Sequence, residues 1–385
     1  MILGIDATNI REGGGLTHLK EILENGSPNS FGITRVVIWS NNTTLNNLPN
    51  PNWLYKISHK YLNKSFIFSF IYQALLLSKS AKKIHKCDLL FIPGGTFFGN
   101  FDNIVSMSQN MLPFEKKEYL RFKRWKTRLR FIILGFTQSL TFKKSKGIIF
   151  LTNYAKEKIS TRINLNVHKS KIIPHGISSS FLKEPNIQKP IENFNKKKPF
   201  KLLYVSIVTE YKHQWNVASA VLKLKEEGYP ITLDLVGDII DESKNKLDKI
   251  LSSRLNAEKT VRYLGLLPYK ILSKNYSNAD GFVFASSCEN MPIILIEAMT
   301  SGLPIACSIM GPMPEVLGDA GVYFNPTNVD SIYTALKELL DNNYLRAEIS
   351  KKAFNKSINY TWKNCSDETF KYFTEIIKQQ NENKK

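Results

Sequence analysis

The chain alternates short apolar runs with longer stretches of helical spacing. In the first half, strands are predicted at Met1–Asp6, Val36–Trp39, Leu89–Pro93, Ile104–Met107 and Gly147–Leu151. Helical spacing marks Leu16–Asn25, and Ser65–Lys83 is predicted to be one buried helix. Strands that alternate with helices favour a parallel α/β sheet.

The second half repeats this pattern more regularly. Strands are predicted at Lys201–Ile207, Ile231–Val236, Val261–Leu264, Gly281–Ala285, Pro304–Ser308 and Gly321–Phe324. Helices are predicted at Gln214–Glu227 and Asp241–Arg254, and a long amphipathic helix at Tyr360–Lys378 closes the chain. About six βα units of this kind predict a doubly wound sheet.

The length of 385 residues and one polar, proline-punctuated stretch predict two domains. We expect an α/β architecture of two doubly wound, Rossmann-like parallel-sheet domains. The first would cover residues 1–182, a linker residues 183–200 and the second residues 201–359. Residues 360–385 would form a helix that packs back on the first domain.

Composition and charge narrow the partners and the location. The net charge of +20 predicts an anionic partner such as nucleotide phosphates, anionic lipid or nucleic acid, although a lysine-rich composition would account for part of it. Four widely spaced cysteines fit a reducing cytosol. The first residues lack a basic segment, so no signal peptide is expected, and the longest apolar run, Ser65 to Ser78, is too short to span a bilayer.

Ligands of open α/β sheets bind at the carboxyl ends of the strands, so the turns that follow each strand carry the candidate chemistry. Gly13, Gly14 and Gly15 precede a helix, where backbone N–H groups can approach a phosphate; a flexible turn is the alternative. Lys212 follows a strand and could neutralise a diphosphate; a plain surface lysine is the alternative.

Two glutamates separated by seven residues form the third candidate. Glu289 lies in the loop after the strand Gly281–Ala285, and Glu297 lies in a helix whose neighbouring residues are apolar. A buried carboxylate costs several kcal/mol unless a partner or ligand compensates it. A ribose would supply hydroxyl donors, and a backbone or arginine partner is the structural alternative.

This segment resembles the E-x7-E signature of the family 4 glycosyltransferases, which are retaining enzymes of the GT-B fold. The resemblance continues through EAMTSGLPIACSIMGPMPEVLGDAGVYFNP and extends back to Leu264–Pro268 and Asn278–Asp280. Upstream, KIIPHGIS and LLYVSIVTEYKHQ resemble two further family elements. The resemblance to the family therefore covers the whole carboxyl domain, and it covers the amino domain mainly through the glycine loop.

The resemblance implies a role for each matching residue. Glu297 would bind the donor ribose, Glu289 would contact the donor sugar, and Lys212 would stabilise the leaving diphosphate. The glycine loop would face the same phosphates from the other domain. The remaining donor-binding candidates are His213, Asn290, Met291, Pro292 and the main-chain N–H groups of Ile293 and Ile294.

Two departures from the family pattern matter. Ile207 stands where many members carry an arginine, so charge neutralisation would rest on Lys212, His213 and backbone dipoles. Many members also carry a histidine where this chain reads Ser106–Met111. Gln109 or Asn110 is our candidate for holding the donor or acceptor sugar; a helix-capping Asn is the alternative.

The resemblance implies transfer with retention from a nucleotide-diphosphate sugar, by front-face attack. No strict D-x-D motif occurs, so neither a metal site nor a cofactor is expected. The wording SSCENMP around Glu289 is typical of bacterial surface-polysaccharide enzymes of O-antigen, capsule or lipopolysaccharide synthesis. The acceptor would be a growing glycan or a polyprenyl-diphosphate-linked one.

The stretch from Glu115 to Lys146 carries eleven Lys/Arg and two acids. Apolar residues recur in it at helical spacing: Phe122, Trp125, Leu129, Ile132, Ile133, Phe136 and Leu140. It is predicted to be one basic amphipathic helix, whose apolar stripe either lies on anionic lipid or packs on the sheet. A cytoplasmic enzyme at the inner membrane face, attached through residues 116–146, is the expectation.

Two other functions compete. A sugar-nucleotide 2-epimerase has a similar fold but needs acid/base groups elsewhere, and the E-x7-E context argues against it. A nucleic-acid- or polyanion-binding protein would use the net charge of +20, but the sequence lacks a recognition motif, so nucleic acid is not expected as a partner.

Overall fold

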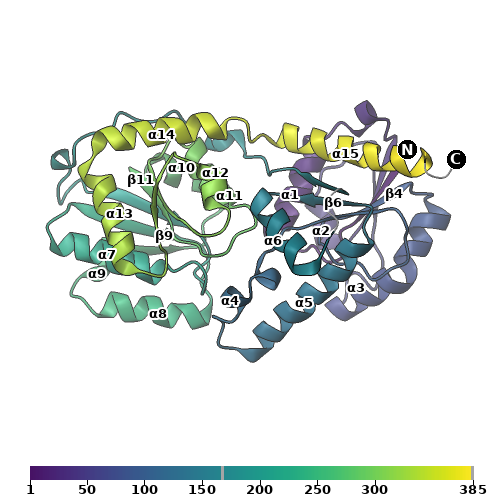
Figure 1. Cartoon of the computed structure of the whole chain (residues 1–385), viewed down its shortest axis with the longest axis horizontal. Coiled ribbons are helices and arrows are strands. Elements are labelled where there is room, and N and C mark those ends of the chain that lie inside the picture. The colour runs from purple at the N-terminus through teal and green to yellow at the C-terminus, as the bar shows by residue number, and fades with distance from the viewer. Residues whose placement is uncertain (166–168, 383–385) are drawn as a thin grey trace. The chain divides into compact units, whose positions relative to one another are not determined.

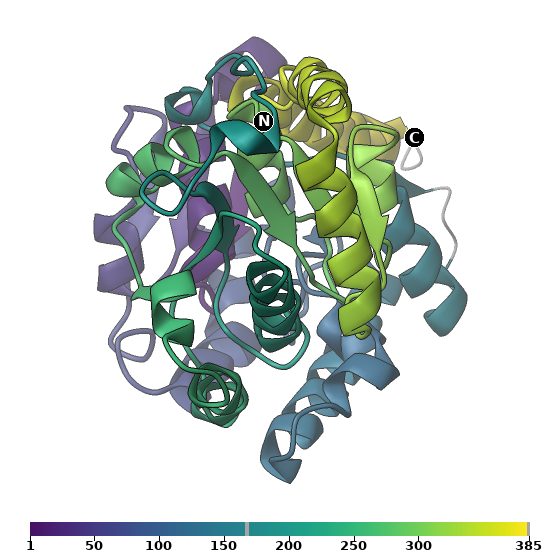
Figure 2. The same ribbon diagram turned by 90° about the vertical axis from the view of Figure 1, so that its left-hand side faces the viewer.

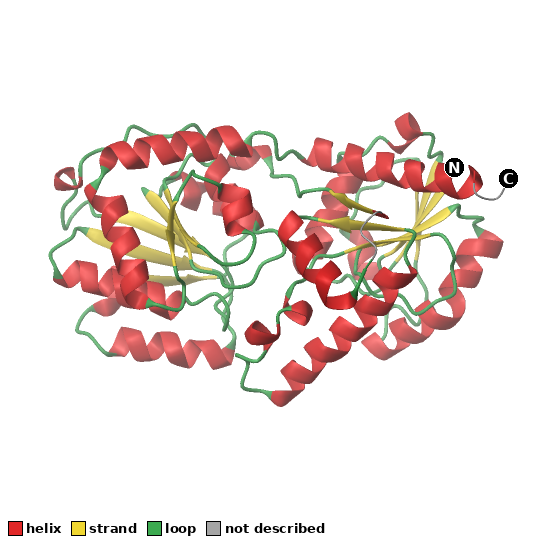
Figure 3. Ribbon diagram, viewed as in Figure 1, coloured by secondary structure: helices red, strands yellow, loops and turns green. Residues whose placement is uncertain are grey.

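The computed structural model describes residues 1–165 and 169–382. Their contacts divide the chain into two compact units, and each is described by itself. The amino unit consists of residues 1–114, residues 129–176 and the chain from Thr361 onward. The carboxyl unit consists of residues 115–128 and 177–360. Each unit is a parallel sheet flanked by helices, as the sequence predicted (Figure 3).

The amino unit contains a seven-stranded parallel sheet in the order β3-β2-β1-β4-β5-β6-β7. Its strands are β1 (Ile2–Asp6), β2 (Arg35–Trp39), β3 (Leu54–Ile57), β4 (Leu89–Ile92), β5 (Ile104–Met107), β6 (Gly147–Phe150) and β7 (Ser170–Ile172). The edge strands β3 and β7 were not predicted. Both are only partly buried, so neither needs the continuous apolar run that marks a central strand.

Helices and turns surround this sheet (Figure 1). The α-helices are α1 (Gly13–Glu24), α2 (Asn42–Asn46), α3 (Phe66–Tyr72), α6 (Asn153–Ile163) and α15 (Trp362–Glu382). The short 3₁₀ and π turns are η1 (Pro28–Phe31), η2 (Gln73–Leu77), η3 (Ser80–Ile84) and η4 (Leu112–Phe114). The closing helix α15 packs against α1 and η1 within this unit.

The segment Ser65–Lys83 is helical from Phe66 onward, as predicted, and consists of α3 and the π-helices η2 and η3. The prediction that this helix is buried was wrong, because one side of it faces out. Ile67, Leu75 and Ile84 are 67%, 70% and 68% exposed. The polar residues within this run, Ser69 and Gln73, are buried, so the positions of polar residues do not mark its outer face.

The carboxyl unit contains a six-stranded parallel sheet in the order β10-β9-β8-β11-β12-β13. Its strands are β8 (Phe200–Val205), β9 (Ile231–Val236), β10 (Val261–Gly265), β11 (Gly281–Phe284), β12 (Ile305–Ser308) and β13 (Val322–Phe324). All six coincide with predicted strands to within two residues at each end, including the edge strand β10, of which only Val261 is buried.

Helices cover both faces of this sheet, and α7 packs against α13 (Figure 2). The longer ones are α7 (Gln214–Glu226), α8 (Asp241–Ser252), α10 (Tyr269–Ser277), α11 (Ile293–Thr300), α13 (Val329–Asp341) and α14 (Asn343–Ser357). The short ones are α4 (Lys116–Tyr119), η6 (Ser179–Phe181), η7 (Ile191–Asn193), α9 (Ala257–Thr260) and α12 (Met313–Leu317).

The basic stretch forms two helices where one was predicted. α4 ends at Tyr119, and the 20-residue helix α5 begins at Trp125 and ends at Lys144. The apolar stripe faces out: Trp125, Ile132, Ile133 and Phe136 are 66%, 51%, 54% and 66% exposed. The alternative that this stripe packs on the sheet is therefore wrong, because smaller and polar residues with two phenylalanines form the buried face. That face consists of Phe131, Gly135, Gln138, Thr141 and Phe142.

The units differ from the expected domains in two segments: residues 177–182, expected in the first domain, belong to the carboxyl unit, and so do residues 115–128. Residues 115–128 lie between β5 and β6 in sequence, yet they belong to the carboxyl unit. Side-chain contacts with residues distant in the sequence hold this segment in the carboxyl unit. The amino-acid composition of the segment therefore does not reveal which unit it belongs to. Among the described helices, none combines the length with the apolar character that a bilayer-spanning segment requires.

Candidate active site

The strand order of the carboxyl unit locates its ligand-binding edge. The chain winds outward from β8 to β9 and β10, then returns to β11 on the other side of β8. Loops after β8 and β11 therefore diverge at a topological switch point, where α/β sheets bind their ligands. Lys212 follows β8 and Glu289 follows β11, so the fold brings these two predicted residues together.

Lys212 and Glu289 form an ion pair between the two loops. Their side chains are only 5% and 15% exposed. The ammonium also lies 5.0 Å from the ring centre of Phe284 and 5.2 Å from that of Tyr211. A cation taken out of water needs such partners, so Lys212 is a fixed charge at the sheet edge and not the surface lysine of the alternative interpretation.

Glu297 lies in the middle of α11 and is 3% exposed. The hydroxyl of Tyr276 donates to its carboxylate at 2.9 Å. Burial raises the pKa of Glu297 to about 7, and hydrogen bonds from Tyr276 and Tyr269 oppose that rise. In the structure the partners of Glu297 are thus two tyrosines, and not the backbone or arginine partner of the structural alternative.

The loop from Asn290 to Pro292 leads into α11. Asn290 and Met291 are buried, and the helix begins at Ile293 with no side-chain cap at Pro292. The Ile293 N–H donates to the Met291 carbonyl at 3.1 Å. An uncapped helix start gathers N–H groups that favour an anion.

His213 caps the start of α7 in the left-handed conformation, with φ of 51°. Its Nε2 lies 2.9 Å from the hydroxyl of Ser287, and that hydroxyl lies 2.5 Å from the carboxylate of Glu118 in α4. Sequence reasoning missed Ser287 and Glu118. They are 169 residues apart; Ser287 lies in the quoted SSCENMP stretch but was given no role there, and Glu118 belongs to no quoted motif.

In the amino unit, the predicted glycine loop and Gln109 lie close to each other. A Cβ on Gly15 would meet Gln109 Oε1 at 3.4 Å, whereas Cβ atoms on Gly13 and Gly14 would meet nothing within 4 Å. Gly13 has φ of +70°, which favours glycine, and α1 begins there without a side-chain cap. The loop therefore leaves open space before an uncapped helix start.

Gln109 and Asn110 have different local partners. Gln109 Nε2 makes a weak contact with the sulfur of Met107 at 3.4 Å. Asn110 Oδ1 accepts from the Leu112 N–H at 3.0 Å, so this oxygen caps the turn η4. The capping alternative thus describes Asn110, and Gln109 is the better candidate for a sugar contact.

One acidic residue at the sheet edge of the amino unit was not predicted to belong to the site. Asp6, at the end of β1, is fully buried and accepts from the N–H and hydroxyl of Thr8 at 3.1 and 2.7 Å and from Gln73 at 2.5 Å. Burial raises the pKa of Asp6 to about 6. The hydrogen bonds from Thr8 fix the turn that precedes the glycine loop, and the bond from Gln73 links this turn to η2.

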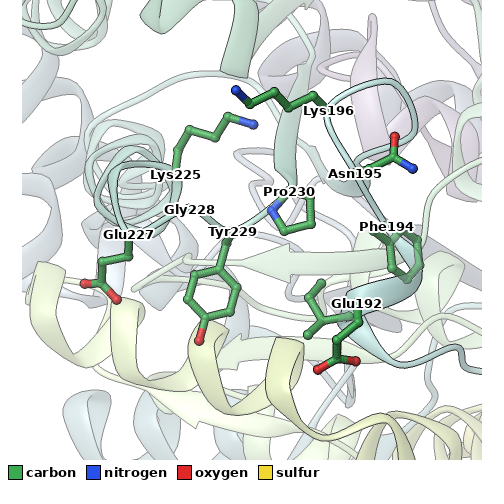
Figure 4. Close-up of a pocket in the computed structure, with 10 residues that line it drawn as sticks. Glu192, Phe194, Asn195, Lys196, Lys225, Glu227, Gly228, Tyr229 and Pro230 are labelled. Atoms are coloured by element: carbon green, nitrogen blue, oxygen red, sulfur yellow. The ribbon is translucent and has the colours of Figure 1, made fainter.

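A hollow of about 560 Å³ lies elsewhere on the carboxyl unit (Figure 4). Phe194, Lys225, Tyr229 and Pro230 contribute to its lining. Pro230 precedes β9, so the hollow lies at the amino ends of the strands and away from Lys212 and Glu289. Shape alone would misplace the site.

Comparison with known proteins agrees with the fold and the sheet-edge residues. Residues 186–356 match the family described as Glycosyl transferases group 1. The carboxyl unit is therefore similar to group 1 glycosyltransferases over most of its length, in agreement with the predicted enzyme class. Lys212, Glu289 and Glu297 all lie within the matched residues.

Curated relatives match parts of the chain. The O-antigen chain mannosyltransferase B of Escherichia coli is 33% identical over 119 residues, which are 31% of this chain and 31% of that protein. The O-antigen chain mannosyltransferase RfbU of Salmonella typhimurium is 22% identical over 54% of this chain and 55% of that protein. The alignments thus span less than two thirds of these relatives.

Solved structures match nearly the whole chain in fold. The crystal structure of Anabaena HepE in complex with UDP has a TM-score of 0.67 and 16% identity, covering 96% of this chain and 98% of that one. The predicted two-domain GT-B fold is confirmed.

Proposed function

We propose that the chain is a retaining glycosyltransferase of family 4 that moves a sugar from a nucleotide-diphosphate donor to a growing glycan. The observation that carries this proposal is the buried Lys212–Glu289 pair at the switch point of a domain similar to group 1 glycosyltransferases. The UDP in the Anabaena HepE structure supports a nucleotide-diphosphate donor.

Lys212 would stabilise the departing diphosphate. The leaving group gains negative charge as the glycosidic bond breaks, and a buried, oriented cation stabilises that charge more than water does. Because Ile207 supplies no second cation, N–H groups at the start of α11, at Ile293 and Ile294, would share this task. This route needs neither a metal ion nor a cofactor.

The two glutamates would hold the rest of the donor. Glu289 would contact the donor sugar once the diphosphate competes for the ammonium of Lys212. Glu297 would accept hydrogen bonds from the ribose hydroxyls in its ionised form. The loop of Asn290, Met291 and Pro292 would position both.

The amino unit would contribute through its own sheet edge. The open space before α1 at Gly13, Gly14 and Gly15 suits a phosphate or sugar that approaches the backbone closely. Gln109, next to Gly15, would bind a sugar hydroxyl, and Asn110 would shape that turn.

The acceptor would belong to surface-polysaccharide synthesis, as O-antigen or another lipopolysaccharide or capsule glycan carried on a polyprenyl diphosphate. The two O-antigen mannosyltransferase relatives support this proposal and make mannose the first sugar to test.

Such an acceptor would be met at the cytoplasmic membrane face, and α5 offers a surface for it. Its outward apolar stripe lies among exposed cations, including Lys126, Arg130 and Lys143. A second apolar surface on α3 joins it through the loop at Phe97 and Phe98. The Phe97 N–H donates to Thr141 of α5 at 2.9 Å, and the rings of Phe98 and Phe70 lie 4.3 Å apart.

A donor screen tests the proposed function. The protein would be mixed with nucleotide-diphosphate sugars, including nucleotide-linked mannose, and free nucleoside diphosphate would be measured with thermal unfolding. We expect one donor to be hydrolysed slowly and to raise the unfolding temperature. Binding of heparin-like polyanions without binding of any nucleotide sugar would contradict the proposal and favour a polyanion-binding protein.

A further inference from the structure

Residues 115–128, which we call the strap, bring an acid from the amino half of the sequence to the carboxyl unit. Its helix α4 carries Glu118, which is 7% exposed. The Arg121 guanidinium donates to both oxygens of this carboxylate, at 2.9 and 3.2 Å. Further along, Arg124 pairs with Glu242 of α8 at 3.0 Å. Arg121 thus fixes the carboxylate of Glu118, and Arg124 fixes the strap to α8.

The hydroxyl of Ser287 lies among three groups but has a single proton to donate. It lies 2.5 Å from Glu118 Oε2, 3.2 Å from the Tyr211 carbonyl and 2.9 Å from His213 Nε2. A charged acceptor at the shortest distance takes the proton. Ser287 therefore donates to Glu118, and its oxygen is left to accept from His213.

We propose that Glu118 is a positioning residue that acts through Ser287 to hold His213 in the Nε2–H tautomer, which leaves Nδ1 as a hydrogen-bond acceptor. This inference rests on the proposed function for its catalytic consequence, but the tautomer itself does not depend on it. In a neutral imidazole one nitrogen donates and the other accepts, so fixing Nε2 fixes both.

The surroundings keep the ring neutral. Burial, together with the nearby cations Arg121 and Lys246, lowers the pKa of His213 to about 3. His213 therefore adds no positive charge for the diphosphate, unlike the role that the sequence suggested. Its Nδ1 remains an acceptor that a sugar hydroxyl could use. Without Glu118, the Ser287 proton could turn to His213 Nε2 and reverse the tautomer.

The tautomer can be read directly from the two ring nitrogens. Protein labelled with ¹⁵N-histidine would be studied by long-range ¹H–¹⁵N correlation. The chain has six histidines, and the signal lost in His213→Gln would identify His213. We expect the Nε2–H form in the wild type and the Nδ1–H form in Glu118→Ala. Glu118→Gln keeps an acceptor oxygen for Ser287 and should keep the Nε2–H form.

Turnover supplies the second readout. Glu118→Ala should lower kcat at least tenfold with little change in the donor KM. This loss is smaller than the one that a wrong histidine tautomer causes in a Ser-His-Asp triad. Because Glu118 acts through Ser287, the double variant Glu118→Ala/Ser287→Ala should be no slower than Ser287→Ala alone. Glu118→Gln should restore most of the rate.

A matched control separates this role from simple anchoring of the strap. Glu242→Ala removes the partner of Arg124 without touching Ser287, and should leave the tautomer unchanged. Retention of the Nε2–H form in Glu118→Ala, or additive losses in the double variant, would overturn the inference. A wild type that shows the Nε2–H form but turns over no donor would count against the proposed function alone.

Discussion

Lys212 shows how one side chain is prepared before any ligand arrives. Two aromatic rings and a carboxylate hold its ammonium at one point, so its entropy is lost on folding and not on binding. Such preorganisation favours the state in which charge develops.

Replacement of this lysine gives the first prediction. Lys212→Ala should lower kcat on the order of 10²-fold or more and change the donor KM less, because the charge on the leaving group develops mainly in the transition state. Steady-state kinetics with the donor found in the screen would measure both. Lys223→Ala, an exposed lysine of α7, is the control, and near-normal turnover in Lys212→Ala would assign this task to backbone groups.

Glu297 gives the second prediction. Glu297→Gln should weaken nucleoside-diphosphate binding by about 1–3 kcal/mol, the range of a hydrogen bond to a charged group. Titration calorimetry would measure this difference, with Glu338→Gln on the surface of α13 as a control. Unchanged affinity in a folded Glu297→Gln protein would remove ribose binding from this residue.

The pH dependence of stability provides a third prediction. The folded protein holds the Glu297 proton up to about pH 7, whereas the ordinary value is 4.5, so the folded state binds more protons between these values. The free energy of unfolding should therefore fall as pH rises from about 4.5 to 7. Glu297→Gln should reduce this slope, and Asp6 should account for part of what remains. Urea unfolding at several pH values would measure it.

Among the elements, α5 has two chemically different faces. One buries Phe131 and Phe142, and the other presents aromatic and aliphatic side chains to the outside. Exposed apolar groups in a contiguous row cost solubility unless they serve an interaction. The cations between them specify an anionic surface.

Vesicle binding tests this helix. Lys126→Glu, Arg130→Glu and Lys143→Glu together should abolish binding to vesicles of anionic lipid, since each cation near such a surface contributes about 1 kcal/mol. These residues are exposed, whereas Arg124 and Arg128 have partners in the protein. Reversal of Lys196, Lys197 and Lys198 changes the net charge equally and should leave binding intact. A wild type that does not co-float with anionic vesicles at low salt would contradict membrane attachment.

The elements also show what sequence can predict. β9 was predicted with its observed bounds because Ile231–Val236 is a buried run between turn signals. The half-buried strands β3 and β7 lack such an apolar run. The sequence also left open which face of α5 is exposed, because that depends on which face packs against the sheet. Lys212 and Glu289 were found through a motif and the rule for strand ends. Neither the motif nor the rule for strand ends could identify Glu118, because its contact with Ser287 exists only after folding.

On the scale of the whole molecule, neither unit is a continuous piece of chain. The amino unit is completed by α15, which buries Phe370 and Phe373 in it. The Tyr372 hydroxyl accepts from the Ile148 N–H at 3.2 Å and donates to the Lys169 carbonyl at 2.8 Å.

Phe370 provides the final prediction. Phe370→Ala should lower the free energy of unfolding of the amino unit by about 3–5 kcal/mol, as for other fully buried phenylalanines. Thermal unfolding followed by limited proteolysis would locate the loss, with Lys371→Ala on the exposed side of α15 as a control. Equal loss in both variants would contradict the packing described for α15.

The position of α15 also matters while the protein is being made. Domains commonly fold in the order of synthesis, amino-terminal first. Here the first 114 residues leave the ribosome long before the helix that completes their unit. The apolar surface that α15 covers stays open until that helix has been synthesised, so the nascent chain needs protection from aggregation up to that point.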